Sequence, residues 1–290
     1  MPGVSLIIPV YESHDTLAGC LDGLRRQTWQ DFEVIIVDSS PSRRAQDILA
    51  KFPEVRVIRS ERRLLPFAAR KLGIQSARGK ILVSTDPDLY FPADWLEQLV
   101  RCHQRTGFAV AGSVTCFGKR RFDWGVHFCK YHDSLPYKPA GPVESAASAN
   151  LLLTREMYEA VGGVPDDAFC SDYLFTLALV ARGFTLWFEP SACVCHHHMV
   201  SWGNYIAERF ARGQDFGRTR ARMWRWSKPR LMFWLLISVF PIRLARLLAR
   251  TARSAQRGRV LDVYLLALPV VALGFGAWLA GEAAAYAQEL

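Results

Sequence analysis

Acidic residues are scarce in the last third of this chain of 290 residues. Residues 206–290 contain 14 lysine and arginine residues but five aspartate and glutamate residues, whereas residues 1–205 contain 22 of each kind. A nucleic-acid-binding protein usually carries its positive charge on the folded module, together with aromatic residues that stack on bases. Here the basic residues flank long apolar runs, which is typical of attraction to anionic lipids. The composition therefore predicts a membrane surface as a partner and excludes nucleic acid as the main one.

Paired cysteine motifs and targeting signals are lacking as well. The seven cysteines are an odd number and their spacing indicates no disulfide framework, so we expect a reducing cytoplasm. The first apolar run, VSLIIPV, is too short for a signal peptide and has no basic lead. Low-complexity segments and internal repeats are absent, and half of the residues are hydrophobic. The chain is therefore expected to form one large domain, or one domain with an appendage.

The first hundred residues alternate regularly between short apolar runs and amphipathic segments. The expected strands are residues 4–10, 32–40, 55–60 and 80–86, and the expected helices between them are residues 13–27, 43–51 and 66–77. This alternation predicts a mostly parallel α/β sheet flanked by helices. Ligands bind at the carboxyl ends of such strands. Polar clusters follow three of these ends, at Pro9–Tyr11, Asp38–Ser40 and Asp86–Asp88.

The middle of the chain continues this pattern less clearly. Residues 108–154 are interpreted as further strands joined by a long loop at 118–140, which is rich in aromatic and basic residues. A helix is expected to begin near Thr154, which can cap it. A second, apolar helix carries Asp172 at its head, and a strand follows that ends in the histidines of CVCHHHM.

Two apolar runs occupy the tail, at residues 231–249 and 260–281. A helix needs about 20 apolar residues to cross a hydrocarbon layer of ~30 Å, and the second run is long enough to do so. The first run is interrupted by Pro241, Arg243 and Arg246, which favours a helix that lies in the membrane interface or re-enters.

The basic linker between the runs, residues 250–259, bears on their orientation. If both runs crossed the membrane, the linker would lie opposite the body of the protein, against the positive-inside tendency. We therefore expect a domain at 1–215 and a membrane-docking helical region at 216–290, with 260–281 either spanning the membrane or lying beside the first run. The alternative is a soluble homo-oligomer, such as a dimer, in which both runs are amphipathic or buried helices.

Six motifs together resemble the family 2 glycosyltransferases, which are inverting enzymes of GT-A fold with a Rossmann-like sheet. The likeness covers roughly residues 3–215 and follows the family's order and spacing. The motifs are SLIIPVYES, EVIIVDSS, AARKLGI, STDPD, GGVPDDAFCSDYLFTLALVARGF and FEPSACVCH.

The resemblance implies a nucleotide-diphosphate-sugar donor and a divalent cation, Mn²⁺ or Mg²⁺. In this family the sugar is transferred by an in-line displacement at its anomeric carbon. Asp88 matches the family's metal-holding aspartate, and Asp86 matches the aspartate nearer the ribose. The other interpretation of Asp86-Pro87-Asp88 is a β-turn, because Asp and Pro are both favoured in turns.

Further matches assign the nucleotide pocket. Asp38 matches an aspartate that contacts the nucleobase, and Pro9, Tyr11 and Glu12 match the other wall of that pocket. Arg70 matches an arginine near the nucleotide. The alternatives are that Tyr11 only packs and that Arg70 is a solvated residue on a helix surface.

On the acceptor side, Asp172 matches the family's general base, which must lie within hydrogen-bonding reach of the attacking hydroxyl. The family usually has Glu-Asp at this point, whereas this chain has Ser171-Asp172. A helix N-cap without catalytic function is the alternative for Asp172. His196 matches a histidine that completes the shell of the catalytic cation. The alternatives are that His198 is the ligand and that His196 only packs.

The CVCHHHM run also raises the possibility of a zinc site. Neighbouring residues on an extended strand point to opposite faces, so the whole run cannot meet one ion. The paired Cys-x-x-Cys spacing of many zinc sites is absent too. The sequence therefore does not favour zinc within this run.

Two further groups receive weaker assignments. One group matches an arginine-containing segment after the family's histidine and is interpreted as binding the diphosphate, with lipid headgroups as the competing ligand: Arg209, Arg212 and Gln214. The other group lies in the expected loop and is interpreted as binding the acceptor, with an ordinary solvated loop as the alternative: Trp124, His127 and Tyr131.

The sequence as a whole predicts a membrane-associated glycosyltransferase of polysaccharide biosynthesis at the cytoplasmic face of the cell envelope. The expected acceptor is a hydroxyl of a lipid-linked glycan. The alternatives are a polyprenyl-phosphate glycosyltransferase and a catalytically silent nucleotide-sugar-binding scaffold. An export channel is not expected, because the chain lacks a set of apolar spans to form one.

Overall fold

The computed structural model describes residues 1–162, 168 and 170–290. Part of the GGVPDDAFC motif, at 163–167 and 169, lies outside the described residues. The chain divides into two compact units. We call Met1–Thr115, Pro139–Asp167 and Ser171–His197 the sheet unit, and Cys116–Lys138, Ala168–Cys170 and His198–Leu290 the helical unit. The predicted boundary at residue 215 stays a prediction.

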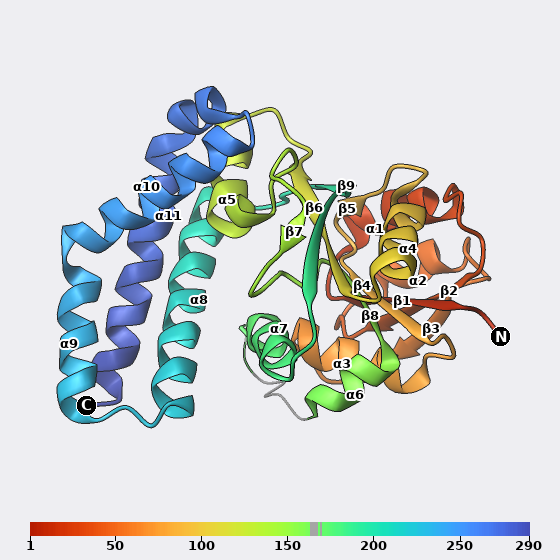
Figure 1. The fold of residues 1–290 in the computed structure, drawn as a ribbon, viewed down its shortest axis with the longest axis horizontal. Coiled ribbons are helices and arrows are strands. Elements are labelled where there is room, and N and C mark those ends of the chain that lie inside the picture. The colour runs from red at the N-terminus through yellow and green to blue at the C-terminus, as the bar shows by residue number, and fades with distance from the viewer. Residues whose placement is uncertain (163–167, 169) are drawn as a thin grey trace. The chain divides into compact units, whose positions relative to one another are not determined.

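The sheet unit is built on a mixed sheet whose order, within the described part of the chain, is β3-β2-β1-β4-β8-β6-β9-β5 (Figure 1). The parallel strands are β1 (Val4–Val10), β2 (Phe32–Asp38), β3 (Arg56–Arg59) and β4 (Ile81–Thr85). The remaining strands are β5 (Leu89–Tyr90), β6 (Ala109–Cys116), β7 (Gly141–Pro142), β8 (Asn150–Thr154) and β9 (Leu186–His196). The predicted α/β class and the four parallel strands are confirmed, and the second half of the sheet adds antiparallel pairs, as between β4 and β8.

Helices cover both faces of this sheet (Figure 1). Their bounds are α1 (His14–Arg25), α2 (Arg44–Leu49), α3 (Pro66–Ser76), α4 (Trp95–Thr106), α6 (Arg155–Val161) and α7 (Ser171–Ala181). Apolar side chains of α3, α6 and α7 form one core cluster with those of β1, β4, β6 and β8. The approach of α3 to β1 is close, because a Cβ atom on Gly73 would lie 2.6 Å from Ile7. Thr154 caps α6 as predicted, since its hydroxyl accepts a hydrogen bond from the backbone N–H of Met157.

The helical unit contains α5 (Arg121–Tyr131), α8 (Trp202–Met223), α9 (Lys228–Val239), α10 (Pro241–Arg257) and α11 (Leu261–Gln288), and a 3₁₀ turn at His132–Ser134. The expected long loop at 118–140 is therefore wrong in part, because α5 occupies its centre. His127, Phe128 and Tyr131 follow Trp124 by three, four and seven positions, which is the spacing of one helix face. That spacing was a signal for a helix.

Helix α11 is the core helix of the helical unit. It buries Val271, Phe275 and Leu279. Its contact with α8 is so close that a Cβ atom on Gly213 would lie 2.0 Å from the carbonyl oxygen of Trp278. Near its end, Glu282 is fully buried and forms ion pairs with arginines of two neighbouring helices, Arg220 at 2.9 Å and Arg243 at 2.7 Å.

The apolar tail forms one helix that is long and apolar enough to cross a membrane, counted over the described residues. This helix is α11, whose most apolar 18-residue window has a mean hydropathy of 2.1 and is 39% buried. The first run instead forms α9 and α10, which meet at an angle of 66°. The break falls at Phe240–Pro241, where proline ends a preceding helix and begins the next one. The interruption expected at Pro241 is confirmed.

One ion-pair group ties α5 to α8 within the helical unit. The Oε1 atom of Glu208 lies 2.9 Å from Lys130 Nζ and 2.8 Å from Arg212 Nε. Burial acts to raise the pKa of Glu208, but the charges of Lys130 and Arg212 outweigh it and hold that pKa at about 2. The carboxylate therefore stabilises the folded state wherever it is ionised.

The Glu208→Gln variant should lower the free energy of unfolding by on the order of 2 kcal/mol near neutral pH. The carboxyl has a pKa of about 2 in the folded protein and an ordinary value of 4.5. Its contribution is therefore complete above the ordinary value and is lost as the pH falls toward the folded one. Urea unfolding followed by circular dichroism at a series of pH values measures this difference.

A matched control is Glu289→Gln, which removes an ion pair between α8 and α11 in which the Arg222 side chain is 65% exposed. Exposed pairs contribute up to about 1 kcal/mol, so this variant should change little. A difference between wild type and Glu208→Gln that stays constant from neutral to strongly acidic pH would contradict the assignment.

Candidate active site

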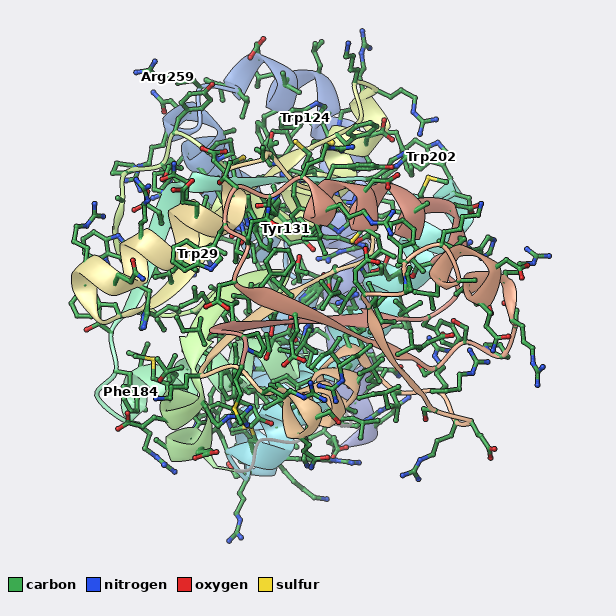
Figure 2. All side chains as sticks on the ribbon, turned by 90° about the vertical axis from the view of Figure 1, so that its right-hand side faces the viewer. Trp29, Trp124, Tyr131, Phe184, Trp202 and Arg259 are labelled. Atoms are coloured by element: carbon green, nitrogen blue, oxygen red, sulfur yellow. The ribbon has the colours of Figure 1, made fainter. Side chains whose placement is uncertain are left out.

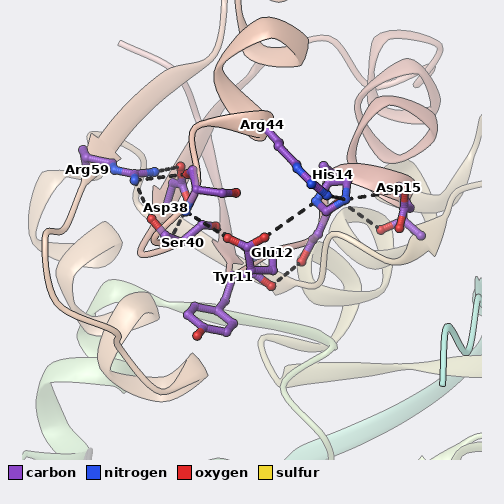
Figure 3. Close-up of polar contacts among 11 residues, drawn as sticks. Tyr11, Glu12, His14, Asp15, Asp38, Ser40, Arg44 and Arg59 are labelled. Atoms are coloured by element: carbon purple, nitrogen blue, oxygen red, sulfur yellow. Dashed lines mark hydrogen bonds and ion pairs between the residues drawn. The ribbon is translucent and has the colours of Figure 1, made fainter. Parts of the chain in front are cut away.

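The carboxyl end of β2 carries Asp38, which is 1% exposed in a network of polar contacts (Figure 3). Its Oδ1 atom accepts a hydrogen bond of 2.9 Å from the backbone N–H of Ser40, and its Oδ2 atom pairs with Arg59. The guanidinium of Arg59 also donates to the carbonyl oxygen of Ser40. Arg59 stands opposite Asp38 in the register of β3 and β2. The sequence interpretation missed Arg59, although its place at the end of a parallel strand was a signal.

The carboxyl end of β1 forms the other side of this network (Figure 3). Glu12 has a positive φ of 51°, and its backbone N–H donates to the Ser40 hydroxyl at 2.8 Å. Hydrogen bonds from Ser42 lower the pKa of Glu12, so its carboxyl is ionised at neutral pH. Tyr11 is 38% exposed, and the guanidinium of Arg63 lies 4.3 Å from its ring centre. The two strand ends are thus joined through Glu12, which sequence reasoning assigned to the nucleotide pocket, and through Ser40 and Ser42.

Pro9 is buried within β1. A proline in a central strand would normally remove a ladder hydrogen bond. Here the pairing of β1 with β4 ends at Ile7, so Pro9 lies beyond the segment that is paired on both sides. The predicted role of Pro9 in the base pocket stays a prediction.

The Asp86-Pro87-Asp88 stretch links the carboxyl end of β4 to the short strand β5. Asp86 pairs with Arg70 of α3. The carbonyl oxygen of Asp88 accepts a hydrogen bond of 2.9 Å from the N–H of His197, which fixes the backbone beside β9. The β-turn interpretation of this stretch and its interpretation as a binding site are therefore compatible. The turn directs the carboxylates of Asp86 and Asp88 to different partners.

Arg70 lies between the carboxylates of Asp86 and Asp172. Its side chain is 4% exposed, pairs with Asp86 and lies 3.9 Å from Asp172 Oδ2. The alternative of a solvated arginine on a helix surface is therefore wrong. A buried guanidinium needs carboxylate partners, since an unpaired buried charge costs several kcal/mol.

Asp172 lies in the first turn of α7, which begins at Ser171. Its Oδ2 atom accepts a hydrogen bond of 2.7 Å from the hydroxyl of Ser148, and 29% of its side chain is exposed. Ser148 precedes β8, and sequence reasoning missed it because an antiparallel strand brings its beginning, not its end, to this edge of the sheet. A hydrogen-bonded, partly exposed carboxylate can still accept a proton from an incoming group.

Asp88 and His196 can hold a cation between them. His196 Nε2 lies 3.5 Å from Asp88 Oδ2, and Leu89 is paired with His196 in the register of β5 and β9. One carboxylate and one imidazole leave room for diphosphate oxygens and water, which suits Mn²⁺ or Mg²⁺. His198, the alternative ligand, instead lies with its Nε2 atom 3.1 Å from Nδ1 of His127 in the helical unit. The geometry favours His196.

The remaining predicted residues lie in the helical unit. The guanidinium of Arg209 is buried 4.5 Å from the ring centre of Trp278, Arg212 pairs with Glu208, and the Gln214 amide donates to Gln288 at 3.3 Å. Their assignment to the diphosphate stays a prediction.

The three residues assigned to the acceptor lie on α5, from which the labelled side chains of Trp124 and Tyr131 come in Figure 2. The His127 ring lies between them, with centroids 5.6 and 5.4 Å away. His127 is fully buried, so Trp124 and Tyr131 are the better candidates for acceptor contact.

Comparisons with known proteins bear on the family and the fold of the chain. The family model described as Glycosyl transferase family 2 matches residues 5–162. Glycosyltransferase AglE of Haloferax volcanii is 24% identical over 287 residues, which cover 92% of this chain and 92% of that protein. The poly(ribitol-phosphate) beta-glucosyltransferase of Bacillus spizizenii is 36% identical over 100 residues, or 32% of this chain and 16% of that protein.

Solved structures show the same fold. The mannosyltransferase PcManGT from Pyrobaculum calidifontis, in complex with GDP-Man and Mn²⁺, has a TM-score of 0.64 and 21% identity, over 99% of this chain and 88% of that one. S. aureus TarS in complex with UDP has a TM-score of 0.56 and 15% identity, over 100% of this chain and 92% of that one. The family model alone spans more than half of the sequence. The chain therefore belongs to glycosyl transferase family 2 and is a glycosyltransferase of GT-A fold.

Proposed function

We propose that this enzyme transfers a sugar, with inversion, from a nucleotide-diphosphate-sugar donor to a hydroxyl of a lipid-linked glycan at a membrane surface. The observation that carries the proposal is the position of Arg70, which touches Asp86 on the donor side and faces Asp172 on the acceptor side. One buried group thereby sets the spacing between the residue near the donor and the residue proposed as base. An in-line displacement requires such a fixed spacing.

On the donor side, the network of Asp38, Glu12 and Ser40 offers acceptors for the N–H groups of a nucleobase and the hydroxyls of a ribose. Asp38 uses one hydrogen bond at each oxygen, and a carboxylate has about four acceptor positions. Asp88 and His196 would hold a divalent cation, which neutralises the charge that develops on the departing diphosphate. PcManGT, a protein of the same fold, was crystallised with GDP-Man and Mn²⁺, which supports a donor and a cation of this kind.

On the acceptor side, Asp172 takes the proton of the attacking hydroxyl. The Ser148 hydroxyl and Arg70 both face Oδ2 of Asp172, which leaves Oδ1 for the acceptor. A hydroxyl acceptor needs this base, whereas a polyprenyl phosphate is already ionised and does not. The presence of a positioned carboxylate therefore favours a hydroxyl acceptor.

The helical unit would hold the enzyme at the cytoplasmic face of the membrane. Five apolar residues on one face of α9 and at its end are between 46% and 64% exposed: Met232, Phe233, Leu236, Val239 and Phe240. Exposed apolar side chains at helical spacing, flanked by arginines, are typical of a helix that lies in a membrane interface with anionic lipids. The transmembrane assignment of 260–281 stays a prediction, since α11 is also the core helix of its unit.

The Asp172→Asn variant should lower kcat by about 10²–10⁴-fold with a hydroxyl acceptor, the usual contribution of a general base. Binding of the nucleotide should change far less than kcat, because Arg70 keeps its ion pair with Asp86. The control is Asp22→Asn, which makes the same change at an exposed position on α1. Turnover of Asp172→Asn equal to wild type with lipid-linked saccharides would contradict the base, and retained transfer to polyprenyl phosphate would favour that alternative acceptor.

The Asp88→Asn variant should lose the manganese-dependent part of nucleotide binding. In wild type, a nucleoside diphosphate with Mn²⁺ should raise the melting temperature more than either alone, because a ligand at 100 times its Kd stabilises the folded state by about 2.7 kcal/mol. A thermal-shift series with UDP and GDP, with and without Mn²⁺, measures this. Asp94→Asn, at an exposed position nearby, is the control. An unchanged effect of Mn²⁺ on the melting temperature of Asp88→Asn with the nucleoside diphosphate would contradict the assignment of Asp88 to the cation.

Replacing Phe233 and Leu236 by serine should weaken binding to anionic vesicles by at least about tenfold, since a fully buried apolar side chain contributes about 1.5–3 kcal/mol. Sedimentation with phosphatidylglycerol-containing vesicles measures the binding, and phosphatidylcholine vesicles test the role of charge. The control is Val57→Ser, which changes an apolar residue that is 46% exposed in the sheet unit. Equal binding of the double variant and wild type would show that α9 does not contact lipid.

A further inference from the structure

Three metal-ligating side chains that are far apart in the sequence meet in the helical unit. Ligand atoms of Cys116, His127 and His198 all lie within 4.8 Å of one another. His127 is fully buried, His198 is 5% exposed and Cys116 is half-buried. None of the three belongs to the carboxylate and imidazole pair of Asp88 and His196. The cluster is therefore a second place in the chain where a metal ion can bind.

Each ligand comes from a different segment. Cys116 stands at the end of β6, His127 lies on α5, and His198 lies between β9 and α8. Sequence reasoning looked for zinc ligands only within the CVCHHHM run, where alternation along a strand excludes a shared ion. The structure places one histidine of that run, His198, with a cysteine and a histidine from elsewhere.

The donor set is typical of zinc. Thiolate and imidazole ligands suit Zn²⁺, whereas Mg²⁺ and Mn²⁺ prefer carboxylate, carbonyl and water. The Nδ1 atom of His127 and the Nε2 atom of His198 are 3.1 Å apart. Two nitrogens that bind one tetrahedral zinc at 2.0–2.1 Å are about 3.3 Å apart, and a nitrogen and a sulfur about 3.5 Å. The observed distance between the two nitrogens is thus close to that in a zinc site, and the three ligand atoms lie within 4.8 Å of one another, so that small side-chain movements would complete the site.

We propose that Cys116, His127 and His198 bind a zinc ion that links the middle of α5 to the segments that precede α5 and α8. On binding, the thiol of Cys116 loses its proton to solvent and both imidazoles bind through a neutral nitrogen. Three protein ligands leave a fourth position, which water fills from the partly exposed side of Cys116. Beneath the cluster, α5 and α8 share a hydrophobic core that includes Val126, Phe128 and Tyr205.

This assignment gives His127 a role that its burial permits. A fully buried ring cannot contact a glycan acceptor, but it can serve as a ligand whose orientation is fixed by its surroundings. The aromatic rings of Trp124 and Tyr131 pack against His127, with centroids 5.6 and 5.4 Å away. Those contacts hold the imidazole in place before the ion arrives.

The experiment measures zinc binding by the full-length protein after metal removal with a chelator. We expect one zinc ion per chain by equilibrium dialysis, and a rise in the melting temperature when zinc alone is added. Cobalt used in place of zinc should give a thiolate-to-cobalt charge-transfer band in the near ultraviolet. Cys116→Ser and His198→Gln should each weaken zinc binding by at least about tenfold, because even ligand-supporting residues outside the shell cost 10–100-fold. Cys116→Ser should also abolish the cobalt band.

Two matched variants distinguish this site from zinc bound at another thiol or at the cation site of the transferase. Cys193→Ser changes another half-buried cysteine and should leave zinc binding and the cobalt band unchanged. Asp88→Asn should also bind zinc as wild type does. Loss of binding in Asp88→Asn with retention in Cys116→Ser would assign the zinc to the cation site and overturn the proposal.

A measurement on the wild type keeps the proposal testable if a variant fails to fold. Zinc should protect Cys116 from alkylation by iodoacetamide, and addition of a chelator should restore its reaction, as read by peptide mass spectrometry. The rate at Cys193 should not depend on zinc. Equal alkylation of Cys116 with and without zinc would mean that His127 and His198 form only a hydrogen-bonded pair.

Discussion

The contact on which the sheet unit's chemistry depends is the pairing of a buried guanidinium with carboxylates from two parts of the chain. Arg70 reaches Asp86, which follows β4, and faces Asp172, which begins α7. Because removing one partner of a buried ion pair leaves an uncompensated charge that costs about 3–5 kcal/mol, the three residues hold one another in place. The separation between Asp86 and Asp172 is thereby set by α3, a helix whose own position is fixed by close packing of Gly73 on β1.

The parts of this arrangement that could be predicted are those that depend on short, continuous stretches of sequence. The strands at 4–10 and 32–40 end in polar residues, and parallel strands bring such ends to one edge, so the grouping of Glu12 with Asp38 could be expected. Periodicity failed at α5, where aromatic residues at helical spacing were taken for a loop. The antiparallel half of the sheet could not be predicted. Its strands pair after the chain reverses direction, and the residues where it reverses form no recognisable local motif.

The contacts that could not be predicted share a physical origin. Ser148 reaches Asp172 because the antiparallel pairing of β8 with β4 brings the residues before β8 to this edge of the sheet. Registers are determined by the packing of a whole face and leave little trace in the neighbouring residues. The same holds for Cys116 and His198, which are 82 positions apart in the sequence. A motif search cannot find ligands whose spacing is set by tertiary structure alone.

The helical unit is built from three separate segments of the chain, of which the first is Cys116–Lys138 and the last is His198–Leu290. Its core joins Val126 and Phe128 of α5 to Val270 and Phe275 of α11. During synthesis, α5 therefore emerges from the ribosome long before the helices that bury its apolar face. Until α11 is made, that face lacks the native contacts that Val270 and Phe275 provide. The helical unit thus completes its core only when α11 has been made.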